Sequence, residues 1–523
     1  MKRQCVKNVA LLVATLAGSS MAEVSNIKSG DVTSLVKAVN NTAVDEINIE
    51  PGVYDFSALG VSTNNNYATS YMTRKTNPVI LRGTGSKHWS EKTAEEEVVF
   101  RGGDKGSIFY AHGQNPRRSA IYNITFENGY QPEVDKNVNK VGGGAVSWAA
   151  TDGCSPQDGF GILSNCVFRN CGSSYSGGAT YGVDAIDCLY TNCTSGGNGG
   201  GAYGFFNRMA NNFHTNVFVN CVFIDCVAAT NGGGLYCREI DAVTGCSFVG
   251  NYATNSCGGL SSGTMGGLVE RCIFKGNDAK RSRLGRQIDN IAEVRDCLFS
   301  GFGDIHAKSI DRCRFEEGES DFVDNSTGYV TFDAATGDGW LANSLFCGCE
   351  TPRLITNAGV LLDVVNCTFV NNSITGNSQS KDFLFYTFKS ANGTTATNRI
   401  ANCLFSGNKV TGEDLDVNFY ATASALNVIS NSLYVSGWGG TVPERVNFSK
   451  SDKIRFAAGT GRYANSPYYM IKRTSAAFDA GFDMPWMAAG TDLAGSPRLV
   501  GDHVDIGCYE CVVPESGTKF SIR

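Results

Sequence analysis

The sequence has few prolines, few charged residues and no long apolar run beyond its first residues. Proline accounts for 11 of 523 residues, charged residues for 18%, and the net charge is −6. A nucleic-acid-binding protein needs a basic face, so we expect no nucleic-acid partner. No segment after the N-terminus reaches the roughly 18 apolar residues of a membrane-spanning helix. We therefore expect no transmembrane segment in the mature chain.

A short motif, Cys-x-Phe or a close variant, recurs roughly every 25 residues over most of the chain. Its cysteine and aromatic residue lie two apart, so in a strand they point to one face. Asn or Asp often precedes the cysteine and commonly follows the aromatic residue, and both are turn formers. Such a repeat predicts one coil of a parallel β-solenoid. The motif cysteines are Cys166, Cys188, Cys221, Cys246, Cys272, Cys297, Cys313, Cys367 and Cys403.

Glycine clusters mark a second fixed place in successive coils. They lie at 142–144, 177–178, 199–201, 232–234 and 258–259. Glycine supplies positive φ at tight corners and lets neighbouring backbones approach closely. Every coil of a solenoid turns the same corner, so the recurrence supports an all-β solenoid over a helical repeat.

The two motifs together resemble the passenger repeats of chlamydial polymorphic outer membrane proteins, which carry Gly-Gly-Ala-Ile and Phe-x-x-Asn. The second motif is matched at 248–251, 274–277, 369–372 and 405–408, whereas Thr180 and Tyr203 stand where the first has Ile. The resemblance spans about residues 120–440. It implies a right-handed parallel β-helix of the pectate-lyase-like kind, a fold that hosts adhesins, lyases and hydrolases.

The chain divides into four predicted parts. Residues 1–22 resemble a secretory signal peptide, with a basic start, a short apolar core and a small-x-small cleavage site. Residues 23–120 should form the N-terminal cap and first coils, including a short helix capped by Asp31 or Thr33. Residues 121–440 should form the β-helix repeats, and 441–523 the C-terminal coils and cap. Sequences at 478–481, 495–498 and 505–510 look like the closing segment of bacterial surface β-helix proteins, so we expect a secreted or cell-surface bacterial protein.

The chain has 20 cysteines, and loss of Cys5 with the signal leaves 19. The motif cysteines should stack as thiols that pack like small apolar residues. Inter-coil disulfides are the alternative, because exported proteins favour them. Cys347-Gly348-Cys349 and Cys508-x-x-Cys511 could suggest a metal site, but no second Cys-x-x-Cys or histidine cluster accompanies them, so we expect no metal. The best disulfide candidates lie off the motif register: Cys154, Cys171, Cys193, Cys226, Cys237, Cys257, Cys349, Cys508 and Cys511.

No catalytic constellation stands out. Polygalacturonase-like enzymes need paired aspartates and Gly-His-Gly, and neither occurs. A β-eliminating lyase needs a basic side chain and charge neutralisation, often by Ca²⁺. The closest candidates surround one basic turn, which a solvated surface turn would also explain. They are Arg281, Arg283, Arg286, Asp289 and, one coil on, His306. Without lyase chemistry we expect no cofactor.

The clearest binding candidates are aromatic. Counted from the glycine corners, Tyr203 and Tyr236 should point outward on adjacent coils, with Arg238 nearby. Such a pair suits a sugar or a protein partner. The alternative is that the insertion at 205–213 folds over both rings.

These observations favour an exported, monomeric, adhesin-like β-helix that binds polysaccharide or a host or cell surface without catalysis. The alternative is a polysaccharide lyase or glycoside hydrolase acting on acidic polysaccharide.

Overall fold

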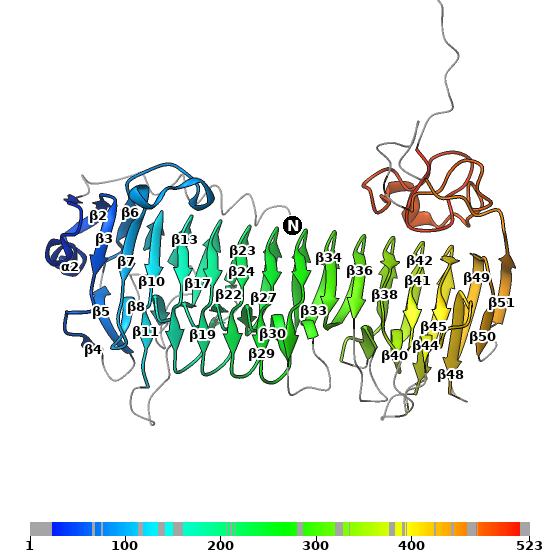
Figure 1. The fold of residues 1–523 in the computed structure, drawn as a ribbon, viewed down its shortest axis with the longest axis horizontal. Coiled ribbons are helices and arrows are strands. Elements are labelled where there is room, and N and C mark those ends of the chain that lie inside the picture. Colours follow the sequence, from blue (N-terminus) through cyan, green and yellow to red (C-terminus); the bar gives the residue numbers. More distant parts are fainter. Residues whose placement is uncertain are drawn as a thin grey trace, which may run out of the picture.

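The chain folds into a right-handed parallel β-helix whose coils stack along one axis (Figure 1). In each coil the chain passes through three columns of parallel strands, here named the flank, phenylalanine and tyrosine columns. The computed structural model describes residues 23–64, 68–74, 77–112, 119–133, 142–149, 161–204, 207–209, 212–214, 216–279, 286–319, 328–333, 335–375, 382–389, 393, 395–422, 425–440, 444–457, 467 and 469–512. The predicted signal peptide lies outside them. None of the helices within these ranges has the length and apolar character needed to cross a membrane.

The columns follow from the strand pairings. The flank column contains β1 (Glu23–Ile27), β2 (Val44–Ile49), β6 (Ile80–Gly83), β9 (Ala120–Tyr122), β13 (Gly161–Ser164), β17 (Val183–Ile186), β23 (Asn216–Val219), β27 (Ile240–Thr244), β38 (Gly339–Ala342), β41 (Leu361–Val365), β45 (Thr397–Ala401), β49 (Leu426–Tyr434) and β51 (Glu444–Lys450). The phenylalanine column contains β3 (Gly52–Asp55), β7 (Val98–Arg101), β10 (Ile124–Glu127), β14 (Val167–Arg169), β18 (Leu189–Thr191), β24 (Val222–Ile224), β28 (Ser247–Val249), β31 (Ile273–Lys275), β34 (Leu298–Phe302), β36 (Arg314–Glu319), β39 (Leu345–Cys347), β42 (Thr368–Val370) and β46 (Leu404–Ser406).

The tyrosine column lies on the remaining side. It contains β5 (Ala68–Arg74), β8 (Ser107–His112), β12 (Val146–Ala149), β16 (Thr180–Tyr181), β20 (Ala202–Gly204), β26 (Leu235–Cys237), β30 (Cys257–Glu270), β33 (Arg286–Arg295), β35 (Asp304–Asp311), β37 (Val330–Asp333), β40 (Arg353–Ala358), β44 (Phe383–Phe388), β48 (Val417–Ala421) and β50 (Trp438–Gly440). The long strands β30, β33 and β35 continue from this column into the flank column.

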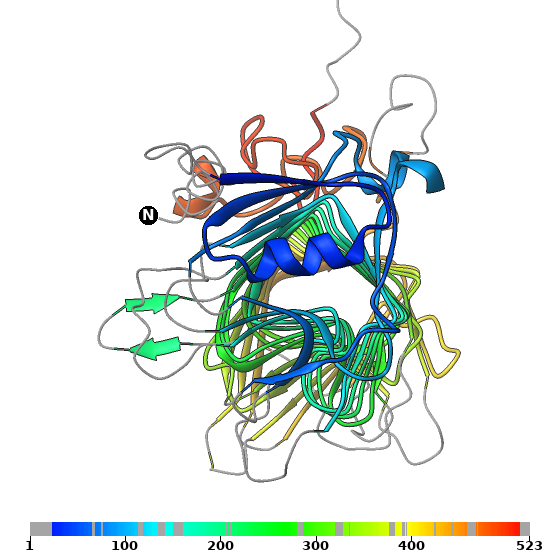
Figure 2. The ribbon, with the colours of Figure 1, turned by 90° about the vertical axis from the view of Figure 1, so that its left-hand side faces the viewer.

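Shorter elements complete the coils. Two-residue strands bridge the phenylalanine and tyrosine columns: β11 (Tyr130–Gln131), β15 (Gly172–Ser173), β19 (Thr194–Ser195), β25 (Val227–Ala228), β29 (Tyr252–Ala253), β32 (Asp278–Ala279), β43 (Ser373–Ile374) and β47 (Lys409–Val410). β4 (Ser62–Asn64) pairs with β5 in antiparallel fashion, and β21 (Asn207–Met209) forms a hairpin with β22 (Asn212–His214). Figure 2 shows this hairpin projecting from the side of the coils.

Single residues in the left-handed region make the corners on either side of the phenylalanine column. Asn220 and Asp225 flank β24 with φ of 52° and 51°. The corresponding corners around β28 are glycines, Gly245 and Gly250. Asn, Asp and Gly tolerate this conformation better than other residues. The predicted turn residues are therefore confirmed where Asn or Asp makes the corner, as at Asn220 and Asp225. After Phe248 and Phe274 the corner residue is instead glycine, Gly250 and Gly276, and the asparagine that follows it is buried.

The motif aromatic residues form one continuous stack inside the helix. From Phe126 to Phe405 each ring packs on its neighbour one coil away; Phe248 and Phe274, for example, lie 4.9 Å apart between centroids and 1° from parallel. The motif cysteines stack beside them, and the backbone N–H of Cys221 donates to Cys246 Sγ at 3.3 Å. All motif cysteines are buried free thiols.

A second inner ladder follows the next corner. Cys171, Cys193 and Cys226 occupy it first, and Asn251 and Asn277 continue it. Asn277 accepts from the N–H and the amide of Asn251 and donates to the carbonyl of Phe248 at 2.9 Å. These three cysteines, which we named as disulfide candidates, are thus buried thiols that replace asparagine at one repeated position.

Both ends carry additional structure. Helix α2 (Val32–Asn40) lies across the first coil (Figure 2), buries Leu35 and Val39, and is capped by Asp31, as predicted. The described residues of the C-terminal cap, 451–457, 467 and 469–512, fold back along the outer side of β42 and β46 (Figure 1). Asn402 anchors it by donating to the carbonyl of Phe482 at 2.9 Å.

Candidate functional site

One row of side chains runs along the outer face of the tyrosine column, with one residue per coil. The residues before them, such as Ala202, Leu235 and Ile305, point inward and are fully buried. The row therefore points outward, because side chains alternate along a strand. Register partners place these residues side by side: Tyr181, Tyr203, Tyr236, Ser261, Asp289, His306, Thr331, Thr356, Tyr386 and Tyr420.

Three tyrosines open the row. The ring centroids of Tyr181 and Tyr203 lie 4.9 Å apart, and those of Tyr203 and Tyr236 lie 5.4 Å apart. All three are half-buried, and Arg238 beside them is exposed. Burial and the neighbouring Tyr236 raise the pKa of Tyr203 to about 12. Its phenol therefore stays protonated at neutral pH and keeps a hydrogen to donate.

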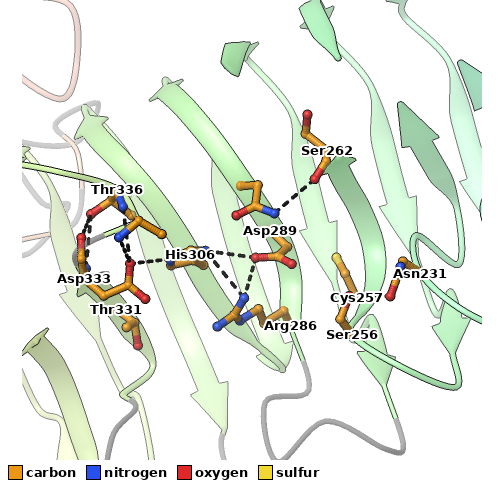
Figure 3. Close-up of polar contacts among 12 residues, drawn as sticks. Asn231, Ser256, Cys257, Ser262, Arg286, Asp289, His306, Thr331, Asp333 and Thr336 are labelled. Carbon is orange, nitrogen blue, oxygen red and sulfur yellow. Dashed lines mark hydrogen bonds and ion pairs between the residues drawn. The ribbon is translucent and has the colours of Figure 1, made fainter. Parts of the chain in front are cut away.

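The middle of the row is a charged cluster (Figure 3). His306 on β35 lies between two carboxylates, with Nδ1 2.9 Å from Asp289 Oδ1 and Nε2 3.2 Å from Asp333 Oδ1. Arg286 forms an ion pair with the same Asp289 oxygen. The side chain of His306 is 4% exposed and that of Asp289 9%, whereas Asp333 is 33% exposed. The cluster thus contacts solvent mainly through Asp333.

These contacts determine the protonation of the cluster. Burial opposes a charge on His306, but its hydrogen bonds to Asp289 and Asp333 outweigh this and raise its pKa above the ordinary value. Burial also acts to raise the pKa of Asp333, yet the bond to His306 and the amide hydrogens of Ala335 and Thr336 lower it to about 2. An imidazolium between two carboxylates leaves neither ring nitrogen free. His306 is therefore a poor general base in this state.

A second aromatic group lies on the other side of the cluster. Tyr386 and Tyr420 stack with 4.8 Å between centroids. The guanidinium of Arg353 lies 4.1 Å from the ring centre of Tyr386. Hydroxyl and charged groups thus fill the row between two tyrosine stacks. These groups and Tyr386 are buried, so the half-buried tyrosines at the two ends, Tyr181, Tyr203, Tyr236 and Tyr420, are the more accessible part of the row.

Several predicted residues come together here. Arg286, Asp289 and His306 share one cluster, and Tyr203 and Tyr236 stack as expected; no described contact tests their predicted roles. Arg281 and Arg283 lie outside the described residues, as do the side chains of the 205–213 insertion. Sequence reasoning missed Asp333 because β37 follows a break in the repeat. It also missed Tyr181. This residue comes three positions after the last glycine of its corner, whereas Tyr203 and Tyr236 come two positions after theirs.

The chemistry open to the cluster is limited by its pairing. Two cations, Arg286 and His306, face two anions, Asp289 and Asp333, so their formal charges cancel. A β-eliminating lyase needs a cation left free to neutralise a uronate and a base ready to take a proton. Both cations of this cluster are already engaged by carboxylates. As paired, the cluster supplies neither the free cation nor the ready base that β-elimination requires.

No protein-family model and no curated protein matches the sequence. Solved structures with a similar fold include the catalytic domain of a GH87 alpha-1,3-glucanase in complex with tetrasaccharides. It is 10% identical, with 83% of this chain and 69% of that chain covered and a TM-score of 0.28. Another is the PL6 family polysaccharide lyase Pedsa3628 from Pseudopedobacter saltans, 9% identical, with coverage of 88% and 100% and a TM-score of 0.28. Likeness at this level assigns no activity to this chain.

Proposed function

We propose that the protein binds a linear polysaccharide along the outer face of the tyrosine column without cleaving it. The observation that supports this most directly is the stack of half-buried tyrosines Tyr181, Tyr203 and Tyr236 on adjacent coils, with the exposed Arg238 beside them. The side chains that follow in the row, from Ser261 to Tyr386, are buried. Coils repeat about every 4.8 Å, a step close to the length of one sugar residue in a linear glycan. A glycan lying along the axis would meet equivalent phenol groups on the three coils that carry Tyr181, Tyr203 and Tyr236.

The details of the row agree with such a ligand. Stacked rings cover one another's faces, so Tyr181, Tyr203 and Tyr236 present their edges and phenol groups outward. A phenol both donates and accepts hydrogen bonds, as sugar hydroxyls do. Export to the bacterial surface, supported by the signal-like residues 1–22, would bring this face to extracellular glycans.

Replacing Tyr203 or Tyr236 by alanine should weaken polysaccharide retention about tenfold each, equivalent to about 1.4 kcal/mol. The physical reason is loss of both the phenol and the ring edge from adjacent coils. The measurement is affinity electrophoresis of the full chain in gels that contain neutral or acidic polysaccharides. Tyr203→Phe separates the hydroxyl from the ring, and Ile273→Thr, on the exposed face of β31, is the matched control. Unchanged retention in both alanine variants would refute a binding role for the row.

A second candidate function is glycoside hydrolysis centred on Asp333. The observation that favours it is the chain of contacts from Arg286 through Asp289 and His306 to the most exposed carboxylate of the cluster. With a pKa of about 2, Asp333 is ionised at neutral pH and suits a nucleophile but not an acid. Hydrolysis needs a second carboxyl group as the acid, and Asp289 is buried in its ion pair.

If Asp333 is catalytic, Asp333→Asn should lower the release of reducing ends at least a hundredfold while retention persists. Asp338→Asn, an exposed carboxylate five residues on, should leave release unchanged. Absence of reducing ends with the unaltered protein across the whole panel would reject hydrolysis and leave the binding function standing.

A further inference from the structure

A cavity of about 440 Å³ lies between the C-terminal cap and the outer face of the flank column. Its cap side is the short turn η6 (Pro485–Ala489) together with Met484. The turn is held in place because Met487 is buried against Val365 and Val504. The cavity size falls within the range of small-molecule sites. It is on a different column from the tyrosine row.

Two tryptophans form a corner of this cavity. Trp340 comes from β38 and Trp486 from η6; their rings are 5.6 Å apart between centroids and 79° from parallel. Both are half-buried. The cavity is also lined by small or short side chains on successive coils, Val365, Ala401 and Ser430. Two tryptophan rings on one side of the cavity and small side chains on the other leave room for a flat, ring-shaped ligand.

The polar part of the lining is a paired charge. Arg399 Nε and Nη2 donate to the two oxygens of Asp363, each at 2.6 Å. Arg399 keeps further N–H groups for a ligand, because a guanidinium has five. Its side chain is 57% exposed and that of Asp363 24%. The ion pair carries no net charge and so favours neither sign of ligand. A carboxylate ligand would be repelled by Asp363, and an ammonium ligand would be repelled by Arg399.

We infer that this cavity is a binding site for a single neutral sugar ring. The apolar face of a pyranose packs on an indole ring, and its hydroxyl edge hydrogen-bonds to Arg399, Asp363 and Ser430. An apolar aromatic ligand would displace water from these groups without replacing its hydrogen bonds, which is unfavourable. The site is separate from the proposed polysaccharide surface, and neither proposal depends on the other.

The test is tryptophan fluorescence of the full chain titrated with neutral monosaccharides and disaccharides. Glucuronate and glucosamine serve as charged comparisons and indole as an apolar one. We expect a saturable change with at least one neutral sugar in the millimolar range, weakened tenfold or more by Trp486→Ala. Trp438→Phe, in the last coil and outside the cavity, should retain the response. Tyr203→Ala should retain it as well, which separates this site from the tyrosine row.

Asp363→Asn tests the charge argument without removing a ring. It keeps the shape of the side chain but leaves the charge of Arg399 uncompensated, so binding should shift from neutral sugars toward glucuronate. The inference is overturned if no neutral sugar gives a saturable change, if only indole does, or if Trp486→Ala leaves the response intact.

Discussion

Replacing Phe274 by alanine is expected to lower the free energy of unfolding by about 3–5 kcal/mol. Its ring is fully buried and stacks on Phe248 and Phe299 at 4.9 and 5.0 Å between centroids. Rings one coil away on both sides cannot move along the axis to fill the gap, because each is held by its own coil. The cavity therefore persists and adds to the lost transfer free energy.

Urea unfolding followed by circular dichroism measures this effect. The matched control is Ile273→Thr, because Ile273 precedes Phe274 on the same strand but is 44% exposed. An exposed substitution of this kind should change stability by less than about 0.5 kcal/mol. A loss below about 1 kcal/mol for Phe274→Ala would show that neighbouring coils close the gap, contrary to a stack held in fixed register.

The loss of stability at Phe274 should affect more than one coil. Each coil of a solenoid contacts only its neighbours, so stability is a sum of coil and interface contributions. Phe274 lies on β31, which pairs with β28 of the coil before and β34 of the coil after. Phe274→Ala therefore weakens the contacts of one coil with both of its neighbours, which the pairings of the other two columns also join.

The fold could be predicted from the sequence because a solenoid repeats its local requirements. Each coil needs an inward aromatic residue and corner residues that tolerate positive φ. The same residue types therefore stand at equivalent positions of successive coils, as Phe248 and Gly250 do in one coil and Phe274 and Gly276 in the next. The second inner ladder was open to the same reasoning. Cys226 and Asn251 stand at the same distance after the motif aromatic residue, although their chemistry differs.

The functional groups were less predictable because they break the repeat. Asp333 reaches His306 from β37, a strand with no motif to set its register in advance. Trp340 and Trp486 meet only because the cap folds back along the side of the coils. No spacing in the sequence encodes that path. By contrast, Tyr203 and Tyr236 follow the glycine corners, so their outward stacking could be predicted.

His306→Leu should lower the free energy of unfolding by about 3 kcal/mol near pH 6, because it removes a buried cation from between two carboxylates. The loss should depend on pH. The pKa of His306 is raised on folding, so its contribution is complete below its ordinary pKa of about 6.5 and is lost as pH rises through the higher folded value. The pKa values of Asp289 and Asp333 are lowered, so their contribution is complete above their ordinary pKa of about 3.9 and is lost as pH falls.

The difference in stability between the unaltered protein and His306→Leu should therefore be greatest between about pH 4 and 6.5. Thermal unfolding across pH 3–9 measures it. His503→Leu is the matched control, because His503 also pairs with a carboxylate, Asp483, but its side chain is 59% exposed. Water screens that exposed pair, so its removal should change little at any pH. If His306→Leu lowers the free energy of unfolding equally at pH 5.5 and pH 8.5, then His306 stabilises the fold through the packing of its ring and not through its charge between Asp289 and Asp333.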